Sequence, residues 1–208
     1  MQIMSIVIPI TVLVFAVIFH EVSHGFVAYK LGDPTAKMSG RLTLNPLPHI
    51  DPFWTIIMPV LFYMSGLPII GGAKPVPVDS RYFKNPKKDM MLVGLAGPVS
   101  NILLAAIGLL LWKLTTLFPA MQSPGLAAII VANTQINLML AAFNLIPIPP
   151  LDGSRIVSGL LPTKWAYGYE KIEPYGFIII MVLLYAGMIR FIYYPIQLFL
   201  TFILKFLR

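Results

Sequence analysis

Two histidines and a glutamate stand together near the start of the chain, in the order His20-Glu21-Val22-Ser23-His24. Histidines four residues apart face the same side of a helix, so both imidazoles can bind one Zn²⁺. The adjacent glutamate could accept a proton from a water molecule held by that ion. The chain has only three histidines, and ionisable groups within an apolar segment are costly and usually functional, which argues against a chance match. The pattern therefore predicts a zinc hydrolase site.

The elements that must position this site are apolar helices. The 208 residues are 58% hydrophobic and 11% charged, with a mean hydropathy of +0.83, which is too apolar for a soluble domain. We expect apolar segments at residues 3–29, 53–70, 90–118, 126–146 and 175–207. Arg190 and Pro195 should divide the last into helices 175–189 and 191–207, as a hairpin or one kinked helix. The sequence thus predicts an all-α polytopic membrane protein of five to six apolar segments, forming a single domain over residues 1–208.

The basic residues indicate how these segments cross the membrane. The first segment lacks the basic start and cleavage site of a signal peptide, so we expect a retained span. The net charge of +7 is clustered, which favours topology over nucleic-acid binding as its explanation. The clusters comprise Lys30, Lys37 and Arg41, and then Lys74, Arg81, Lys84, Lys87 and Lys88. Both should be cytoplasmic, so we expect residues 53–70 to re-enter or cross partially. The alternative is an ordinary short crossing that ignores the charge rule.

A third metal ligand should come from the same depth as the two histidines. His20 lies about 26 Å along the first helix, toward its cytoplasmic end. The segment at 126–146 returns to that side and continues into residues 144–153, where three prolines disfavour regular helix. Asp152 is therefore the candidate third ligand; the alternative is a turn aspartate before glycine. Asn144 could donate a hydrogen bond to a developing oxyanion, or simply cap the end of its helix.

Four motifs in order resemble the site-2 protease family of intramembrane zinc metalloproteases, and in particular its short members without PDZ or CBS domains. They are residues 20–24, Gly-Gly-Ala-Lys-Pro-Val-Pro-Val at 71–78, Ala-Gly-Pro-Val-Ser-Asn at 96–101, and residues 144–153. The resemblance implies a catalytic core within residues 3–155, built from the first, third and fourth apolar segments, followed by C-terminal helices at 175–207. It also implies one zinc ion per chain held by His20, His24 and Asp152, with Glu21 as general acid and base.

Other features of these motifs are open to more than one interpretation. Phe53-Trp54 stands where related short members often have Ile-Gly, which puts the bend of the following segment in question. For Gly97 and Asn101 we favour helix packing over catalysis. For His49 and Asp51 we favour a turn at the membrane interface over a second metal site. Residues 71–78 should be extended, either as an edge strand that pairs with substrate or as a plain loop.

The function predicted from these residues is intramembrane proteolysis. The partners would be a transmembrane protein substrate and the lipid bilayer, with the enzyme in a bacterial plasma membrane and its active site toward the cytoplasm. A metal or proton-coupled transporter is the alternative, but it should show inverted repeats and several intramembrane acids, and this sequence shows neither. A zinc-binding protein without activity would have no need of Glu21. Substrate identity and oligomeric state do not follow from the sequence.

Overall fold

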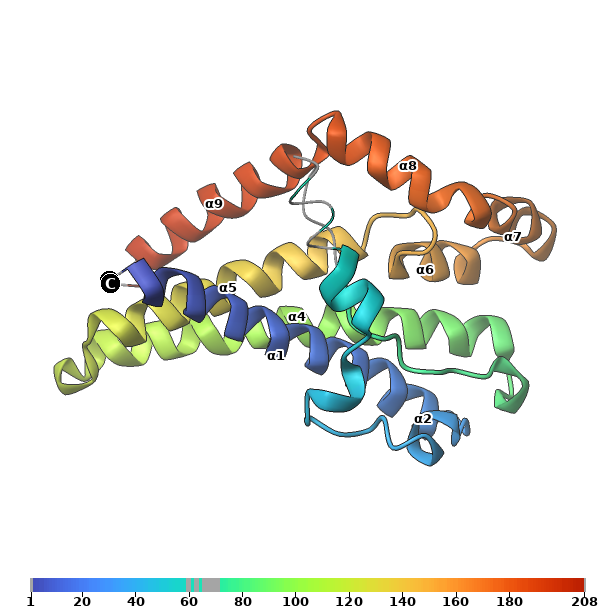
Figure 1. The fold of residues 1–208 in the computed structure, drawn as a ribbon, viewed down its shortest axis with the longest axis horizontal. Helices are drawn as coiled ribbons and strands as arrows, with labels where there is room; N and C mark the ends of the chain where they lie inside the picture. Colours follow the sequence, from blue (N-terminus) through green and yellow to red (C-terminus); the bar gives the residue numbers. More distant parts are fainter. Residues whose placement is uncertain (1, 59–60, 62–63, 65–71, 208) are drawn as a thin grey trace.

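The computed structural model describes residues 2–58, 61, 64 and 72–207, and within these residues all regular structure is helical (Figure 1). Four of the described helices are long and apolar enough to cross a membrane: α1 (Gln2–Lys30), α4 (Pro86–Leu117), α5 (Pro124–Asn144) and α9 (Met188–Phe206). The shorter helices are α2 (Thr35–Met38), α6 (Asp152–Leu160), α7 (Thr163–Glu170) and α8 (Glu173–Tyr185). Short turns of other helix types are η1 (Leu47–His49), η2 (Pro52–Ile57), η3 (Ser80–Tyr82) and η4 (Pro119–Met121). The prediction of an all-α polytopic membrane protein is confirmed.

Local sequence signals set the starts of the two central spans. Both α4 and α5 begin with a proline, which lacks the N–H that a helix start leaves unpaired. At α4 the Asp89 carboxylate accepts a hydrogen bond of 2.9 Å from the Asn85 amide. At α5 the Ser123 hydroxyl accepts one of 3.2 Å from the Leu126 amide. These caps fix where each helix begins and therefore which residues reach the depth of the histidines.

Three spans form the core of the molecule. Helices α1, α4 and α5 pack against one another, α6 packs on α4, and α9 packs on α5. Figure 1 shows α1 and α5 running in one direction along the long axis and α4 in the other. The first, third and fourth apolar segments of the sequence are therefore the three helices of the core, as predicted.

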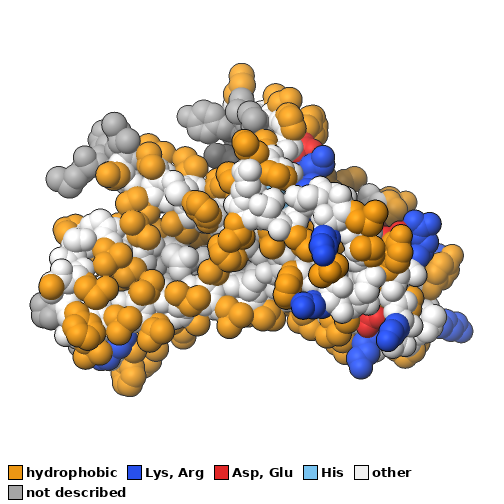
Figure 2. All heavy atoms as spheres, turned by 90° about the horizontal axis from the view of Figure 1, so that it is seen from below, with side chains coloured by type: hydrophobic (Ala, Val, Ile, Leu, Met, Phe, Trp, Pro, Cys, Tyr) orange, Lys and Arg blue, Asp and Glu red, His pale blue; other side chains and the backbone are white. Residues whose placement is uncertain are grey.

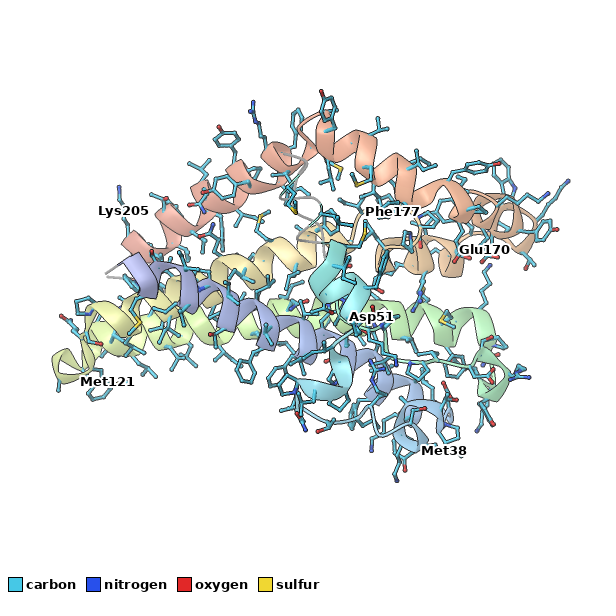
Figure 3. The ribbon with its side chains drawn as sticks, viewed as in Figure 1. Met38, Asp51, Met121, Glu170, Phe177 and Lys205 are labelled. Carbon is cyan, nitrogen blue, oxygen red and sulfur yellow. The ribbon has the colours of Figure 1, made fainter. Side chains whose placement is uncertain are left out.

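The distribution of side chains is that of a protein surrounded by lipid. Large apolar residues of the spans are exposed, for example Leu103 at 59% and Leu110 at 61%, whereas the polar Asn101, Thr134 and Asn137 are fully buried. On the face shown in Figure 2, Lys and Arg side chains gather mainly at one end of the long axis. The stick view places Met38 and Glu170 toward that end, and Met121 and Lys205 at the opposite end (Figure 3).

The two basic clusters lie beside each other. The Asp33 carboxylate, just after α1, accepts a hydrogen bond of 2.7 Å from the amide of Asp79, which lies between Lys74 and Arg81 of the second cluster. A second contact joins the start of the 53–70 segment to the residues that follow it. The Thr55 hydroxyl donates a hydrogen bond of 2.7 Å to the Gly72 carbonyl. Residues on the two sides of the 53–70 segment therefore lie close to each other. Ten of the residues 53–70 lie outside the described residues, so the re-entry of this segment stays a prediction.

Three details differ from the sequence prediction. The C-terminal helices are divided at Gly187, whose φ of 90° is left-handed, and not at Arg190, while Pro195 lies inside α9. Residues 72–79 have no regular structure, and no strand is assigned in the described part of the chain, so of the two alternatives given for residues 71–78 these residues form a loop and not an edge strand. Asp152 is not on an unwound segment but is the first residue of α6. Gly187 can end a helix because glycine adopts the left-handed conformation at no steric cost, whereas a span tolerates an internal proline where its neighbours satisfy the freed carbonyl.

Candidate metal centre

Three side chains from two helices converge on one point. His20 and His24 project from α1, one turn apart, and Asp152 projects from the start of α6. The Nε2 atoms of the two histidines are 3.0 Å apart, and Asp152 Oδ2 lies 3.0 Å from that of His20 and 3.2 Å from that of His24. All three side chains are buried, and within the described residues they are the one group of three or more His, Asp or Glu suited to a metal. The structure thus brings together the three residues that the sequence singled out as ligands.

The donor set fits zinc. Ligand atoms about 2.0–2.1 Å from a tetrahedral zinc lie about 3.3 Å from one another, close to the 3.0–3.2 Å separations found here. Asp152 Oδ2 is buried and accepts no hydrogen bond from the described residues, so a cation is the partner that this oxygen lacks. Two imidazoles and one carboxylate are also a ligand set of catalytic zinc sites, which use three protein ligands.

The far nitrogen of each histidine is held by α4. His24 Nδ1 lies 2.6 Å from the Val93 carbonyl oxygen, and His20 Nδ1 lies 2.6 Å from Asn101 Oδ1. A carbonyl can only accept a hydrogen bond, so His24 carries its proton on Nδ1 and turns the lone pair of Nε2 toward Asp152. Asn101 was expected to serve in packing, and its contact with the candidate ligand His20 was not predicted.

Gly97 allows α4 to approach the two histidines of α1 closely. A Cβ atom at this position would lie 2.5 Å from His24 Nε2 and 2.5 Å from His20 Cε1. These distances are shorter than any side chain tolerates, so only glycine leaves room for both rings. The packing role inferred from the sequence therefore concerns one contact in particular, between α4 and the two imidazoles of the candidate metal site.

The start of α6 is shaped by close backbone contacts. The chain turns after α5, and the Leu151 amide donates a hydrogen bond of 2.9 Å to the Ile148 carbonyl. A Cβ at Gly153 would lie 2.3 Å from the Leu145 carbonyl oxygen, so the turn closes only with glycine there. Asp152 stands in the first turn of α6, where the helix dipole favours a carboxylate. The Asp-Gly pair, a weak signal in the sequence, thus has a steric reason in the fold.

Glu21 and Asn144 lie outside the group of three. Glu21 Oε2 accepts a hydrogen bond of 2.9 Å from the Val76 amide. Val76 is flanked by Pro75 and Pro77, which have no N–H, so it offers the one backbone donor of that stretch. Its contact with Glu21 was not predicted. The signal in the sequence was the Pro-Val-Pro pattern, which leaves a single backbone N–H in need of an acceptor. Asn144 is the last residue of α5 and donates from Nδ2 to the Leu140 carbonyl at 3.0 Å.

The remaining histidine belongs to a turn, the interpretation favoured from the sequence. His49 ends η1, is buried, and pairs its Nε2 with the Thr43 carbonyl oxygen at 2.9 Å. Its own carbonyl accepts a bond of 2.8 Å from the Lys74 amide. Asp51 Oδ1 accepts from the Phe53 amide at 2.9 Å. Neither residue belongs to the metal-binding group.

Two imidazoles and one carboxylate clustered between the helices of a polytopic protein are the features of a membrane metalloprotein. Comparison with known proteins narrows this class. The profile of peptidase family M50 matches residues 113–187. YwhC of Bacillus subtilis, named as a candidate zinc metalloprotease, is 42% identical over 187 residues, covering 88% of this chain and 82% of YwhC. Rip2 of Mycolicibacterium smegmatis, named likewise, is 33% identical over 168 residues, which cover 79% of this chain and 61% of Rip2.

The chain belongs to peptidase family M50, the site-2 protease family. A further relative, the zinc metalloprotease MJ0392 of Methanocaldococcus jannaschii, is 27% identical, and the match covers 75% of this chain and 34% of that protein. No solved structure matches the chain. The protein is therefore a zinc metallopeptidase with several membrane helices, and these matches do not favour the transporter alternative.

Proposed function

We propose that this metallopeptidase is an intramembrane protease with zinc held by His20, His24 and Asp152. It would cleave a peptide bond within or near a transmembrane helix of a membrane-anchored protein. The observation that carries the proposal is the position of the three donor atoms, 3.0–3.2 Å apart and buried against helices that are long enough to span a membrane. A peptide bond that reaches these atoms must come to the interior of the helix bundle.

Glu21 is the proposed general acid and base. Zinc, when bound, supplies a Lewis acid and lowers the pKa of a coordinated water to about 7. The Val76 amide holds Oε2 of Glu21, while Oε1 accepts no hydrogen bond that the described residues show. Glu21 takes a proton from water as the water oxygen bonds to the scissile carbonyl carbon. It then passes this proton to the amide nitrogen as the carbon–nitrogen bond breaks.

Asn144 is the proposed second donor to the oxyanion. One N–H of its side-chain amide bonds to the Leu140 carbonyl, and an amide nitrogen carries two hydrogens, so one is left for a ligand. A donor of this kind contributes roughly a hundred- to a thousandfold to the rate in other hydrolases. Capping of the α5 end remains the alternative role for this side chain.

The substrate has to unwind before it can react, because the amides of a transmembrane helix are already hydrogen-bonded. The irregular residues 72–79 lie beside Glu21 and could pair with an unwound strand. The adjacent basic clusters indicate that this end of the bundle faces the cytoplasm. The bacterial relatives support a plasma membrane location, with the active site toward the cytoplasmic side.

The test is cleavage of a model transmembrane peptide in vesicles that contain the purified chain. Glu21→Gln should retain about one zinc per chain and lose proteolysis, because it removes the base and leaves the three proposed ligands in place. Glu170→Gln, an acid on α7 that bonds to Ser158, is the matched control and should cleave at the wild-type rate. Near-normal turnover by the Glu21 variant would exclude Glu21 from the mechanism. Equal cleavage of a soluble unstructured peptide would contradict the intramembrane substrate.

A further inference from the structure

A line of three asparagines runs from His20 on α1 to Asn101 on α4, then to two asparagines on α5, and ends on α4. His20 Nδ1 lies 2.6 Å from Asn101 Oδ1 on α4. Asn101 Nδ2 donates to Asn137 Oδ1 on α5 at 2.8 Å. Asn137 Nδ2 donates two hydrogen bonds to Asn133, one to its side-chain Oδ1 at 3.1 Å and one to the main-chain carbonyl oxygen of Asn133 at 2.8 Å. Asn133 Nδ2 ends the line on the Leu104 carbonyl of α4, at 2.8 Å. We refer to Asn101, Asn137 and Asn133 as the asparagine relay.

The direction of every bond in the relay is determined by its far end. The Leu104 carbonyl can only accept, so Asn133 must turn its NH₂ toward it and its oxygen toward Asn137. Asn137 must then donate to Asn133 and present its own oxygen to Asn101. Asn101 in turn donates to Asn137, and also to a main-chain carbonyl of α1 at 3.3 Å. What remains for His20 is the oxygen of Asn101, which can only accept.

The structure assigns the asparagine relay as a positioning device that sets the tautomer of His20. Because Asn101 presents an oxygen, the His20 proton is held on Nδ1, and the Nε2 lone pair faces the metal. This inference rests on the proposed role of His20 as a zinc ligand. Asn133 and Asn137 touch no member of the metal-binding group in the described contacts, so they act through Asn101. The relay thereby makes α5 a part of the metal site, although α5 supplies none of its three ligands.

Packing alone does not account for these side chains. Asn101 and Asn137 are fully buried inside spanning helices, where an amide is costly unless each of its hydrogen bonds is made. An apolar side chain of similar size would fill the same space at no such cost. Thr134 shows the contrast, since it is equally buried on α5 but satisfies its hydroxyl within its own helix, on the Ile130 carbonyl at 2.9 Å.

The experiment measures zinc affinity in detergent by competition with a chelator. Asn101→Leu should weaken zinc binding by roughly ten- to a hundredfold, the usual effect of losing a partner of a metal-bound histidine. Asn137→Leu should weaken it by a smaller factor, roughly three- to tenfold, while Thr134→Val, the matched control, should leave it unchanged. The double variant Asn101→Leu/Asn137→Leu should bind zinc no more weakly than Asn101→Leu alone, because Asn137 acts only through Asn101.

A conservative variant separates positioning from packing. Asn101→Asp keeps an oxygen acceptor against His20, as in carboxylate–histidine–zinc arrangements, but loses the two hydrogen bonds that Asn101 Nδ2 donates. It should therefore bind zinc more tightly than Asn101→Leu. Thermal unfolding of the metal-free variants identifies any that fail to fold, and the absorption spectrum with Co²⁺ in place of zinc reports the ligand geometry. Wild-type zinc affinity in Asn137→Leu would overturn the relay, as would losses that simply add in the double variant. His20→Ala with full zinc affinity would instead refute the proposed ligand set.

Discussion

The substitution Gly97→Ala adds one methyl group between α4 and the two histidines. Its Cβ would lie 2.5 Å from His24 Nε2 and 2.6 Å from His20 Nε2, the two nitrogens proposed to bind zinc. That is roughly 1 Å closer than the about 3.5 Å at which non-bonded heavy atoms pack. The rings cannot turn away at low cost, because their Nδ1 atoms bond to Val93 and Asn101, which lie on the same helix as the methyl group.

The expected effect is loss of the metal. Ligand distances in metal sites hold within about 0.2 Å, so a shift of roughly 1 Å removes at least one nitrogen from the coordination sphere. We expect zinc affinity to fall at least ~100-fold. At zinc concentrations that fully activate the wild type, the variant should therefore show no proteolysis. The added methyl should also destabilise the fold by about 1–3 kcal/mol, the usual cost of overpacking a well-packed interior.

Zinc content and chelator competition measure the first effect, and thermal unfolding measures the second. Gly125→Ala is the control, because a Cβ at that position on α5 meets no atom within 4 Å. It should bind zinc and cleave substrate as the wild type does. A folded Gly97→Ala protein with wild-type zinc affinity would refute the proposed geometry, since α1 and α4 could not then be as close as the structure shows.

Three further predictions concern the ligand, the base and the topology. Asp152→Ala should lose most of its zinc, whereas Asn144→Ala should keep the metal and, as an oxyanion donor, lose roughly a hundred- to a thousandfold in rate; full zinc occupancy in the Asp152 variant would exclude that ligand. Val76→Pro removes the amide that holds Glu21 and should slow cleavage with zinc retained, while Val76→Ala keeps the amide and should cleave normally; equal rates would exclude the contact. Single cysteines at the exposed Lys37 and Lys84 should both react with a thiol reagent only from the cytoplasmic side, in a chain with no native cysteine; labelling of position 84 from outside alone would overturn the re-entrant topology.

Much of the architecture could be predicted because it depends on local patterns. Long apolar segments must be helical in lipid, since every backbone hydrogen bond has to be made within the segment. The break before α9 was placed wrongly, at Arg190, because a charge and a proline are conspicuous in a sequence. Gly187 ends α8 through its left-handed conformation, and a single glycine in an apolar run gives little sign of this. Asp152 was expected beside the histidines partly because residue 152 should lie at their depth, and in the structure the three side chains do lie together.

The sequence by itself determined the membrane class and the pairing of His20 with His24, because helical periodicity places residues four apart on one face. Only the tertiary structure decided what surrounds that pair. Asn101 is 81 residues from His20, and Val76 is 55 residues from Glu21, so no local pattern relates them. Their contacts depend on how α1 and α4 are rotated and how closely they approach, and that follows from the packing of whole helices, with Gly97 at the point of closest contact.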